Sequence, residues 1–404
     1  MKQARKGFLK SRAGATAATG LSNGATLKMT SAQETSGTNP RQRSITGIEI
    51  FPFFMEGKQV IRIALGNMAA QEVLVRLRTN DGVAGWGEAS PFSPVTGETQ
   101  ATDVAMAKSL AGIVKGRDPF DVARIVLEMD RLTPYQPSIK AAFEMAIWDI
   151  CGKIAGQPVV HLLGQYRNSF DTDRTVYLDK PEVMAQKAKE IAGEGYKVVK
   201  VKLGESPEAD IERVRTIRRV VGPDIGIGTD ANQGWTPNEA VRALRGLDPF
   251  RIEFCEQPVL FSDWEGMKFV RQNVGIPIMA DESVHSPTDA IEAVRRNAAD
   301  MINIKLMKSG GILQSVRIAH IADGANLKCM LGCMSETRVA LTAAAHVVMS
   351  QKNVAYADLD SFTEHKIDPV IGGMAVKDGT VTLPDKPGLG LDIDPSWLQT
   401  LKPA

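Results

Sequence analysis

The chain has 404 residues, of which 43% are hydrophobic and 24% are charged, and its formal net charge is +1. This composition is typical of a globular protein with one large domain and a smaller one. The near-neutral charge excludes a strong electrostatic field for nucleic acid, and no apolar run approaches the ~20 residues of a membrane-spanning helix. We therefore expect neither partner. The cysteines all lie in apolar stretches and predict buried thiols rather than disulfides or a zinc site: Cys151, Cys255, Cys329 and Cys333.

Residues 1–44 differ from the rest of the chain because they are rich in Ala, Gly, Ser and Thr and are basic at the start. One interpretation is a disordered tail. The other is an export signal, because Arg5-Lys6-Gly7-Phe8-Leu9-Lys10 resembles a twin-arginine signal with lysine as its second basic residue. The first interpretation implies a cytoplasmic protein and the second a periplasmic one. In neither case do we expect this segment to be part of the fold.

Residues 45–165 predict a small α+β domain. β-rich runs lie at 48–50, 72–77 and 85–89, and Asn80-Asp81-Gly82 forms a turn signal between the last two. Helical periodicity follows at 101–115, 121–130 and 138–152. We expect a three-stranded sheet covered by helices.

After Asp171 short apolar runs alternate with helical segments. This rhythm predicts a modified (β/α)8 barrel of the TIM type, an α/β fold, over residues 166–360. The eighth helix is expected to be missing or short, and residues 361–404 are expected to return to the first domain and complete it. The eight expected strands lie at 174–178, 198–203, 225–229, 251–255, 277–280, 301–306, 329–332 and 354–357.

The second barrel strand contains two lysines, Lys200 and Lys202. Strand alternation places both on the same face. If that face points into the barrel, mutual repulsion and burial should lower the pKa values of both toward the range of a general base. The alternative is an exposed edge with two solvated lysines, but these two stand among valines and Leu203.

Three carboxylates stand at the ends of the next three strands: Asp230, Glu256 and Asp281. One alone would be explained as a helix N-cap. Three that converge at the carboxyl end of a barrel would repel strongly without a cation, and hard oxygen ligands favour Mg²⁺ or Mn²⁺. The sequence therefore predicts a divalent metal site.

The sixth and eighth strands add further charges. Lys305 lies in the sixth strand and should face the site opposite Lys202, whereas Lys308 is placed nearer the loop and on the other face. The eighth strand ends in Asp358-Leu359-Asp360, with both carboxylates on one face.

This ordered set of residues resembles the enolase superfamily in its muconate-lactonizing subgroup, and the Asp358-x-Asp360 pair resembles the dipeptide epimerase family. The resemblance covers residues 45 to about 395. It implies Mg²⁺ on the three carboxylates, which would stabilise an enediolate, and Lys202 and Lys305 as the two acid–base catalysts that invert an α-carbon. Lys200 would contact the substrate carboxylate, and the Asp358–Asp360 pair would bind the free ammonium group of a dipeptide. A homo-oligomer is compatible with the sequence, which does not determine the oligomeric state.

The sequence departs from the family pattern in the first-domain loop that is expected to close over the barrel. Family members that act on Ala-Glu often carry an arginine there, whereas residues 63–68 read Ile-Ala-Leu-Gly-Asn-Met, with Arg62 just outside. This argues against a preference for Ala-Glu. The end of the seventh strand, Gly332-Cys333-Met334-Ser335, is expected to line the pocket.

Other readings of the sequence remain open. N-acylamino acid racemases and o-succinylbenzoate synthases share the lysines and metal ligands, but their substrates lack the free ammonium that Asp358 and Asp360 would bind. Muconate cycloisomerisation ranks lower for the same reason. A Schiff-base aldolase would also use an inward lysine but would not need a carboxylate at the end of each of three successive strands. A structural barrel without catalysis gives no reason for five strands to end in charged residues.

Overall fold

In this computed structural model the described chain is residues 43–404, which form one compact unit. The two interpretations of the N-terminal segment fall on residues outside this range, except for its last two residues. Arg43 forms an ion pair with Asp81 and the Ser44 N–H donates to the Asn80 side chain, so these two residues already belong to the compact unit. None of the described helices is both long and apolar enough to span a bilayer.

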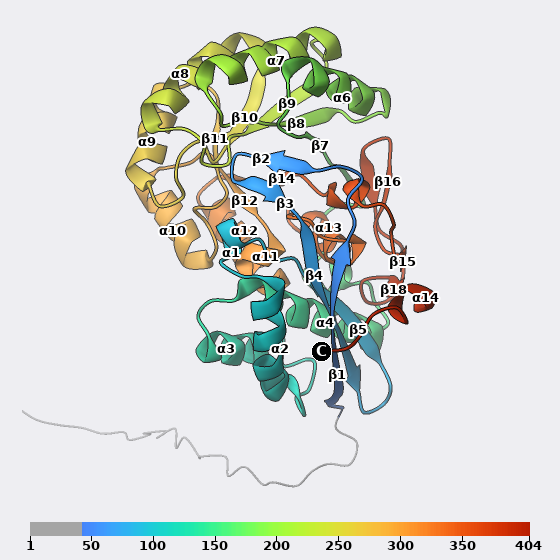
Figure 1. Ribbon diagram of the computed structural model, residues 1–404. Coiled ribbons are helices and arrows are strands. Elements are labelled where there is room, and N and C mark those ends of the chain that lie inside the picture. Colours follow the sequence, from blue (N-terminus) through green and yellow to red (C-terminus); the bar gives the residue numbers. More distant parts are fainter. Residues whose placement is uncertain (1–42) are drawn as a thin grey trace, which may run out of the picture. The chain divides into compact units, whose positions relative to one another are not determined.

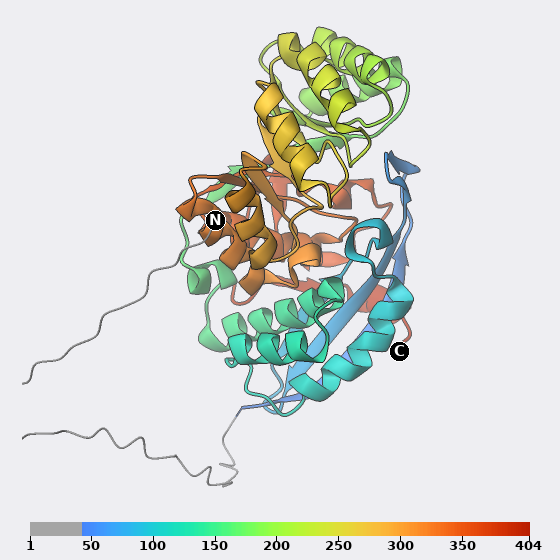
Figure 2. The same ribbon diagram turned by 90° about the vertical axis from the view of Figure 1, so that its left-hand side faces the viewer.

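The first part of the described chain contains an antiparallel sheet in the order β1-β4-β5 (Figure 1). β1 is Ile45–Met55, β4 is Ala70–Thr79 and β5 is Ala84–Ala89. Helices α2 (Gln100–Val114), α3 (Val122–Leu132) and α4 (Pro137–Ala155) cover one face of the sheet (Figure 2). The close approach of α4 to β5 requires glycine, because a Cβ on Gly87 would lie 1.9 Å from the Ala142 carbonyl oxygen.

The second part is a curled sheet of eight parallel strands within the described residues, in the sequential order β7 to β14. Each strand pairs in parallel with the next, as Lys202 on β8 does with Asp230 on β9. The strands are β7 (Arg174–Val176), β8 (Val198–Lys202), β9 (Gly226–Asp230), β10 (Ile252–Glu256), β11 (Ile278–Ala280), β12 (Met301–Ile304), β13 (Lys328–Leu331) and β14 (Val354–Ala357). The connecting helices are α6 (Pro181–Gly193), α7 (Pro207–Val221), α8 (Pro237–Leu247), α9 (Trp264–Asn273), α10 (Pro287–Arg296), α11 (Leu306–Ser309), α12 (Ile312–Gly324) and α13 (Arg338–Ser350).

The two outer strands of this sheet meet, since the Asp173 N–H donates to the Ala357 carbonyl at 2.9 Å. No long helix follows β14; a 3₁₀ turn, η2 (Ser361–Glu364), stands in its place. The modified barrel predicted from the sequence is therefore confirmed, with its short eighth helix.

The C-terminal residues form small sheets and return to the first sheet. β15 (Val370–Gly372) pairs with β18 (Leu391–Ile393), and β16 (Ala375–Lys377) and β17 (Thr380–Thr382) pair with β6 (Ser169–Asp171). Helix α14 (Pro395–Leu398) brings Trp397 edge-to-face onto Phe53 of β1, with ring centroids 5.2 Å apart. The boundaries of the capping domain and the barrel remain predictions. The remaining short elements are β2 (Ile61–Ile63), β3 (Gly66–Met68), α1 (Ser93–Thr96), α5 (Val159–Leu163) and η1 (Asp248–Phe250).

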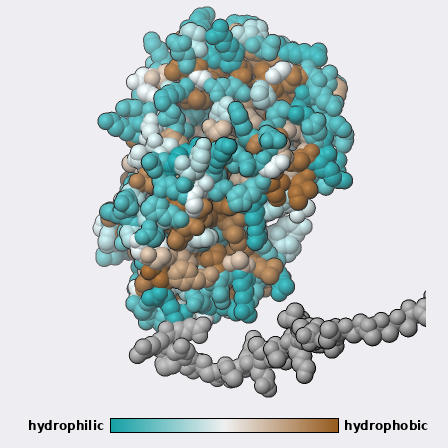
Figure 3. Space-filling model, turned by 180° about the vertical axis from the view of Figure 1, so that it is seen from behind, coloured by the Kyte–Doolittle hydropathy of each residue, from teal (hydrophilic) through white to brown (hydrophobic). Residues whose placement is uncertain are grey.

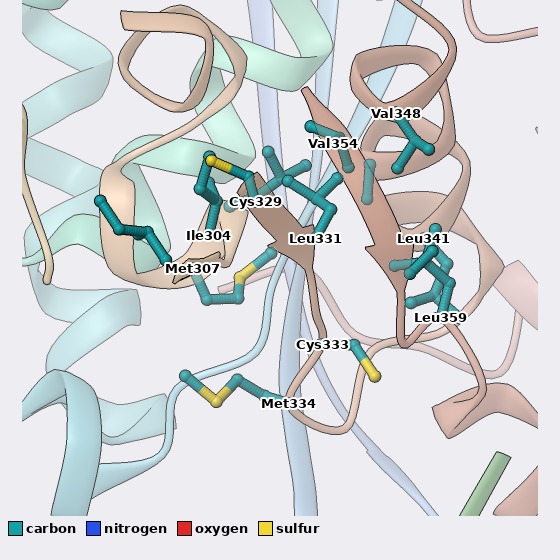
Figure 4. Packing of buried hydrophobic residues seen from close by; sticks show 14 of the residues in the cluster. Ile304, Met307, Cys329, Leu331, Cys333, Met334, Leu341, Val348, Val354 and Leu359 are labelled. Carbon is teal, nitrogen blue, oxygen red and sulfur yellow. The ribbon is translucent and has the colours of Figure 1, made fainter. Parts of the chain in front are cut away.

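Buried apolar side chains fill two large clusters, one inside and around the barrel and one between the antiparallel sheet and its helices. Figure 4 shows part of the first, where Cys329 and Leu331 of β13 pack near Val354 of β14 and Val348 of α13. In the face drawn in Figure 3, hydrophilic residues predominate and hydrophobic ones gather in patches. All four cysteines are free and buried, as the sequence predicts.

Buried glutamates tie the antiparallel sheet and its helices to the barrel by capping barrel helices. The Glu144 carboxylate on α4 accepts the N–H groups of Ile312 and Leu313 at the start of α12. Glu88 on β5 accepts those of Thr337 and Ala340 at the start of α13. Because the first N–H groups of a helix lack partners within the helix, these carboxylates satisfy donors that would otherwise be buried unbonded.

Candidate active site

A cavity lies at the carboxyl ends of the barrel strands, under the β2–β3 hairpin. Its charged lining comes from the barrel, and its apolar lining comes largely from the hairpin and the segment around α1. The charged residues are Lys202, Glu282, Lys305, Asp358 and Asp360, and the apolar ones include Ile61, Ile63, Met68, Phe92, Val95 and Met334.

The structure brings together the three carboxylates predicted to bind metal. Asp230, Glu256 and Asp281 are each fully buried, and one oxygen of each lies within 4.8 Å of the other two. They occupy neighbouring positions because β9, β10 and β11 are neighbours in the sheet and each carboxylate stands at or just after its strand end.

The sequence Glu256-Gln257-Pro258 positions the third of these carboxylates. The Gln257 side-chain carbonyl accepts the N–H groups of Asp281 and Ser283, and its amide donates to the Ser283 hydroxyl at 2.8 Å. Asn303 on β12 donates to Glu256 at 2.8 Å. Gln257 and Asn303 therefore fix the orientation of the acidic group, and sequence reasoning did not assign Asn303 a role.

Lysine ammonium groups surround the three carboxylates. The Nζ of Lys202 lies 2.6 Å from an Asp230 oxygen, and that of Lys305 lies 2.8 Å from an Asp281 oxygen. Lys200 lies 2.8 Å from Glu256. Lys202 and Lys305 come from β8 and from the end of β12, which lie on opposite sides of the barrel, as predicted.

The expected lowering of the pKa is wrong for Lys200. Burial favours the neutral amine of Lys200, but Asp358, Glu256 and Asp230 outweigh it and hold its pKa well above the usual range. Burial is likewise outweighed at Lys305 by Asp281 and Glu256, so its pKa is raised. The sequence argument counted repulsion between lysines but not the carboxylate that each lysine contacts.

The position of Lys308 was also predicted wrongly. β12 ends at Ile304, one residue before Lys305, and the chain turns directly into the short helix α11. This turn directs Lys308 inward, where its buried ammonium donates to the Asp281 carboxylate and to the Asp281 and Asn303 carbonyls. Strand alternation does not hold beyond the end of a strand, which is why the sequence placed Lys308 on the other face.

Asp358 and Asp360 follow β14 and line the far side of the cavity. Asp358 accepts from Lys200 at 2.6 Å, and Asp360 accepts from the Thr175 N–H at 2.6 Å. Burial alone would raise the pKa of Asp358, but Lys200 and Lys202 lower it to about 2. Burial and the neighbouring Asp358 raise the pKa of Asp360 to about 7. This end of the cavity therefore favours a positively charged group.

Several lining residues were missed by sequence reasoning. Asn232 donates to Glu282 at 3.2 Å, and both line the cavity beside Lys202. Tyr177 lines the cavity after β7, near Asp360. Cys333 and Met334 line it as expected. The signals for Asn232 and Glu282 were present, since each lies within two residues of a predicted metal ligand at a strand end.

The expected capping loop is a short hairpin, in which β2 pairs with β3 and Ile61 stands opposite Met68. Ile61, Ile63 and Met68 face the cavity. The Arg62 guanidinium instead forms an ion pair with Glu205, outside the cavity lining. The cavity lining contains no arginine within the described residues.

The charge around the cavity fits a divalent cation. In the described chain, six buried carboxyl groups face four buried lysines, so negative charge is in excess. Burial and Asp230 raise the pKa of Glu256 to about 8, which reflects this excess. A cation among the three clustered oxygens would relieve it. The carboxyl groups are Asp230, Glu256, Asp281, Glu282, Asp358 and Asp360, and the lysines are Lys200, Lys202, Lys305 and Lys308.

Comparison with known families assigns the chain to one of them. Residues 183–397 match the family described as enolase C-terminal domain-like, and residues 49–164 match the mandelate racemase / muconate lactonizing enzyme N-terminal domain. A hydrophobic dipeptide epimerase of Enterococcus faecalis is 42% identical over 83% of this chain and 95% of its own. The chain belongs to the dipeptide epimerases of the enolase superfamily. It is therefore an isomerase of the epimerase and racemase type.

Solved structures of family members agree with this assignment. The Enterococcus faecalis dipeptide epimerase, complexed with Mg and L-Leu-L-Tyr, has a TM-score of 0.85 and 40% identity, and the match covers 86% of this chain and 99% of that one. The Cytophaga hutchinsonii dipeptide epimerase, complexed with Mg and D-Ala-L-Val, has a TM-score of 0.88 and 35% identity, covering 89% and 99%. An L-Ala-D/L-Glu epimerase of Bacillus subtilis is 39% identical in sequence over 80% of this chain and 89% of its own.

Proposed function

We propose that this epimerase is magnesium-dependent and inverts the α-carbon of the C-terminal residue of dipeptides with small or apolar side chains. One observation carries the proposal. A single cavity contains two opposed lysines beside a carboxylate cluster, an acidic pair at its other side and an apolar hairpin over both.

Asp230, Glu256 and Asp281 would hold the metal ion. Their oxygens are hard ligands of the kind that Mg²⁺ and Mn²⁺ prefer. When bound, the ion supplies positive charge beside the substrate carboxylate and so lowers the cost of removing the adjacent proton. Relatives from Enterococcus faecalis and Cytophaga hutchinsonii have been solved with Mg, which supports this part of the proposal.

Lys202 and Lys305 would move the protons. A substrate α-carbon between them has one lysine on each face, so that one amine removes the proton while the other ammonium returns one from the opposite side. Both ammonium groups now contact metal-ligand carboxylates, at 2.6 and 2.8 Å. Cation binding to the same oxygens would compete with these ion pairs and free the lysines for the substrate.

Asp358 and Asp360 would bind the ammonium group at the N-terminal end of the dipeptide. They stand across the cavity from the carboxylate cluster, and Lys200 is the only lysine among the described residues that bridges the two groups, at 2.6 Å from Asp358 and 2.8 Å from Glu256. The negative charge of this pair suits the ammonium end of a zwitterionic peptide, whose carboxylate would meet the proposed metal ion.

The side chain of the inverted residue would lie against Ile61, Ile63 and Met68. Apolar surface there favours apolar side chains, and no guanidinium is directed at a substrate carboxylate. The relative named a hydrophobic dipeptide epimerase is 42% identical, and the Bacillus subtilis relative named an L-Ala-D/L-Glu epimerase is 39% identical. Identity alone does not separate the two specificities, so the support for apolar side chains comes from the hairpin lining.

The alternative is racemisation of N-acylated amino acids. A relative named an N-succinyl-L-Arg/Lys racemase from Bacillus cereus is 33% identical over 88% of this chain. An N-acyl group has no ammonium to offset the two buried carboxylates Asp358 and Asp360, which disfavours this reaction.

The direct test is incubation of the protein with Mg²⁺ and a library of dipeptides in D₂O, read by mass spectrometry. Free dipeptides with small or apolar C-terminal residues should gain one deuterium, and their N-acetyl forms should gain little. Preferential labelling of N-acetyl or N-succinyl amino acids over every free dipeptide would assign the alternative function.

A further inference from the structure

A second group of metal-binding side chains lies in the cavity, apart from the carboxylate cluster. The thiol of Cys333 and the carboxylates of Asp358 and Asp360 each place one ligand atom within 4.8 Å of the other two. All three residues are buried and all three line the cavity. Figure 4 shows Cys333 on the loop beyond the end of the strand that carries Cys329 and Leu331.

We propose that Cys333, Asp358 and Asp360 form a binding site for a thiophilic divalent cation such as Zn²⁺ or Cd²⁺, which excludes the substrate ammonium and inhibits the enzyme. The consequence for activity rests on the proposed function, whereas the binding site itself does not.

Each of the three residues has a ligand atom that is not committed elsewhere. Asp358 bonds to Lys200 through Oδ2, while its Oδ1 has no hydrogen-bond partner among the described residues although Asp358 is only 4% exposed. Asp360 uses Oδ2 for the Thr175 N–H, and its Oδ1 lies 3.8 Å from the Cys333 sulfur. A buried, unpaired carboxylate oxygen is costly unless a cation or donor reaches it.

A single lysine among the described residues forms an ion pair with this group, whose two carboxylates are buried. Lys200 is the ammonium that contacts Asp358 directly, and it is shared with Glu256.

The donor set selects the class of ion. One sulfur and two carboxylate oxygens, with a fourth position open to the cavity, match the three-ligand zinc sites that keep a water or substrate position. Sulfur disfavours Mg²⁺, so this site and the three-carboxylate cluster should discriminate between ions. Tetrahedral zinc needs ligand atoms about 3.3–3.8 Å apart, and the Cys333 sulfur already lies 3.8 Å from the Asp360 Oδ1.

Binding releases a proton. Burial, Asp358, Glu336 and Asp360 hold the pKa of the Cys333 thiol well above its usual range, so the sulfur is protonated at neutral pH. The ion forms a metal–sulfur bond as the S–H bond breaks, and the proton passes to solvent; no electron is transferred.

The test uses the full chain with saturating Mg²⁺, titrated with Cd²⁺ or Co²⁺ and followed by the sulfur-to-metal charge-transfer band in the ultraviolet. One equivalent should produce the band in the wild type. Cys333→Ser should abolish it, and Asp360→Asn should weaken binding by at least the roughly 10- to 100-fold seen for lost outer-sphere partners. Cys151→Ala is the matched control, because that thiol is buried elsewhere in the fold and should leave the band unchanged.

Zn²⁺ should then raise KM for a dipeptide without changing kcat in the wild type, whereas the rate of Cys333→Ser with Mg²⁺ should be the same with and without Zn²⁺. A band that persists in Cys333→Ser, or inhibition that is unchanged in that variant and relieved only by more Mg²⁺, would overturn the proposal. A Cys333-dependent band in a protein that epimerises no dipeptide would support the site while contradicting the proposed function.

Discussion

Lys200 and Asp358 form a buried ion pair across the seam at which the barrel closes, with Nζ 2.6 Å from Oδ2. The same ammonium lies 2.8 Å from Glu256. Lys200 therefore links the Asp358–Asp360 pair to the three-carboxylate cluster. A substitution of Asp358 should alter the charge balance at both groups. Asp360 does not contact Lys200; it is held by the Thr175 N–H.

This difference predicts distinct kinetics for two isosteric variants. Asp360→Asn should raise KM for free dipeptides by about 10- to 100-fold with a smaller effect on kcat, because it removes a charge-assisted contact to the ammonium. Asp358→Asn should lower kcat as well, because Lys200 is released toward Glu256. Steady-state kinetics on paired free and N-acetyl dipeptides measures both. An equal loss of kcat/KM for the free and the acetylated peptides would show that these residues do not bind the ammonium group.

Metal dependence follows from the three-carboxylate cluster. Treatment with EDTA should abolish epimerisation and Mg²⁺ should restore it, because the excess buried negative charge would otherwise oppose formation of a carbanion. Asp281→Asn should weaken Mg²⁺ binding, measured by calorimetry. Full turnover by metal-free protein, verified by elemental analysis, would contradict this expectation.

The apolar hairpin predicts a specificity change. Met68→Arg would place a guanidinium at the cavity wall, where it could pair with a substrate side-chain carboxylate. We expect kcat/KM for dipeptides ending in glutamate to rise relative to those ending in leucine, by about tenfold or more. Met68→Leu keeps the wall apolar and should leave the ratio near the wild-type value. An unchanged ratio in Met68→Arg would mean that the hairpin does not contact the side chain of the inverted residue.

The helix-capping Glu144 predicts a pH-dependent stability difference. Burial raises its pKa to about 7 from an ordinary value of 4.5, although the Leu313 and Ile312 N–H groups oppose the shift. A carboxyl whose folded pKa is raised contributes stability below pH ~4.5 that is lost as pH rises through ~7, at most on the order of 3 kcal/mol. Glu144→Gln resembles the protonated acid, so its stability relative to wild type should improve between pH 5 and pH 8 in urea titrations. A difference independent of pH would show that Glu144 titrates normally.

The sequence predicted those parts of the fold and site that depend on regular periodicity. The alternation of strands and helices predicted the barrel. The positions of Asp230, Glu256 and Asp281 followed because each stands at the carboxyl end of one of three successive strands. Lys308 was misplaced because the chain leaves the strand at Ile304 and turns into a helix, which alternation cannot anticipate.

Long-range contacts were also beyond the sequence. The pKa of Lys200 depends on Asp358, which lies 158 residues away, and the side chain of Arg62 is directed to Glu205, 143 residues away. The short hairpin around Gly66, with φ of 115°, was read as a loop because its strands have only three residues each.

The measurement that tests the central claim most directly is α-proton exchange in D₂O by Lys202→Ala and Lys305→Ala, followed separately for each epimer of one dipeptide by NMR. Each variant should lose epimerisation by about 10²- to 10⁴-fold, because inversion needs a proton donor and acceptor on opposite faces. Residual exchange, where it persists, should be confined to opposite epimers in the two variants. The exposed Lys197→Ala is the control and should behave as wild type. If either active-site variant still interconverted the epimers at near the wild-type rate, the two-lysine account would be contradicted.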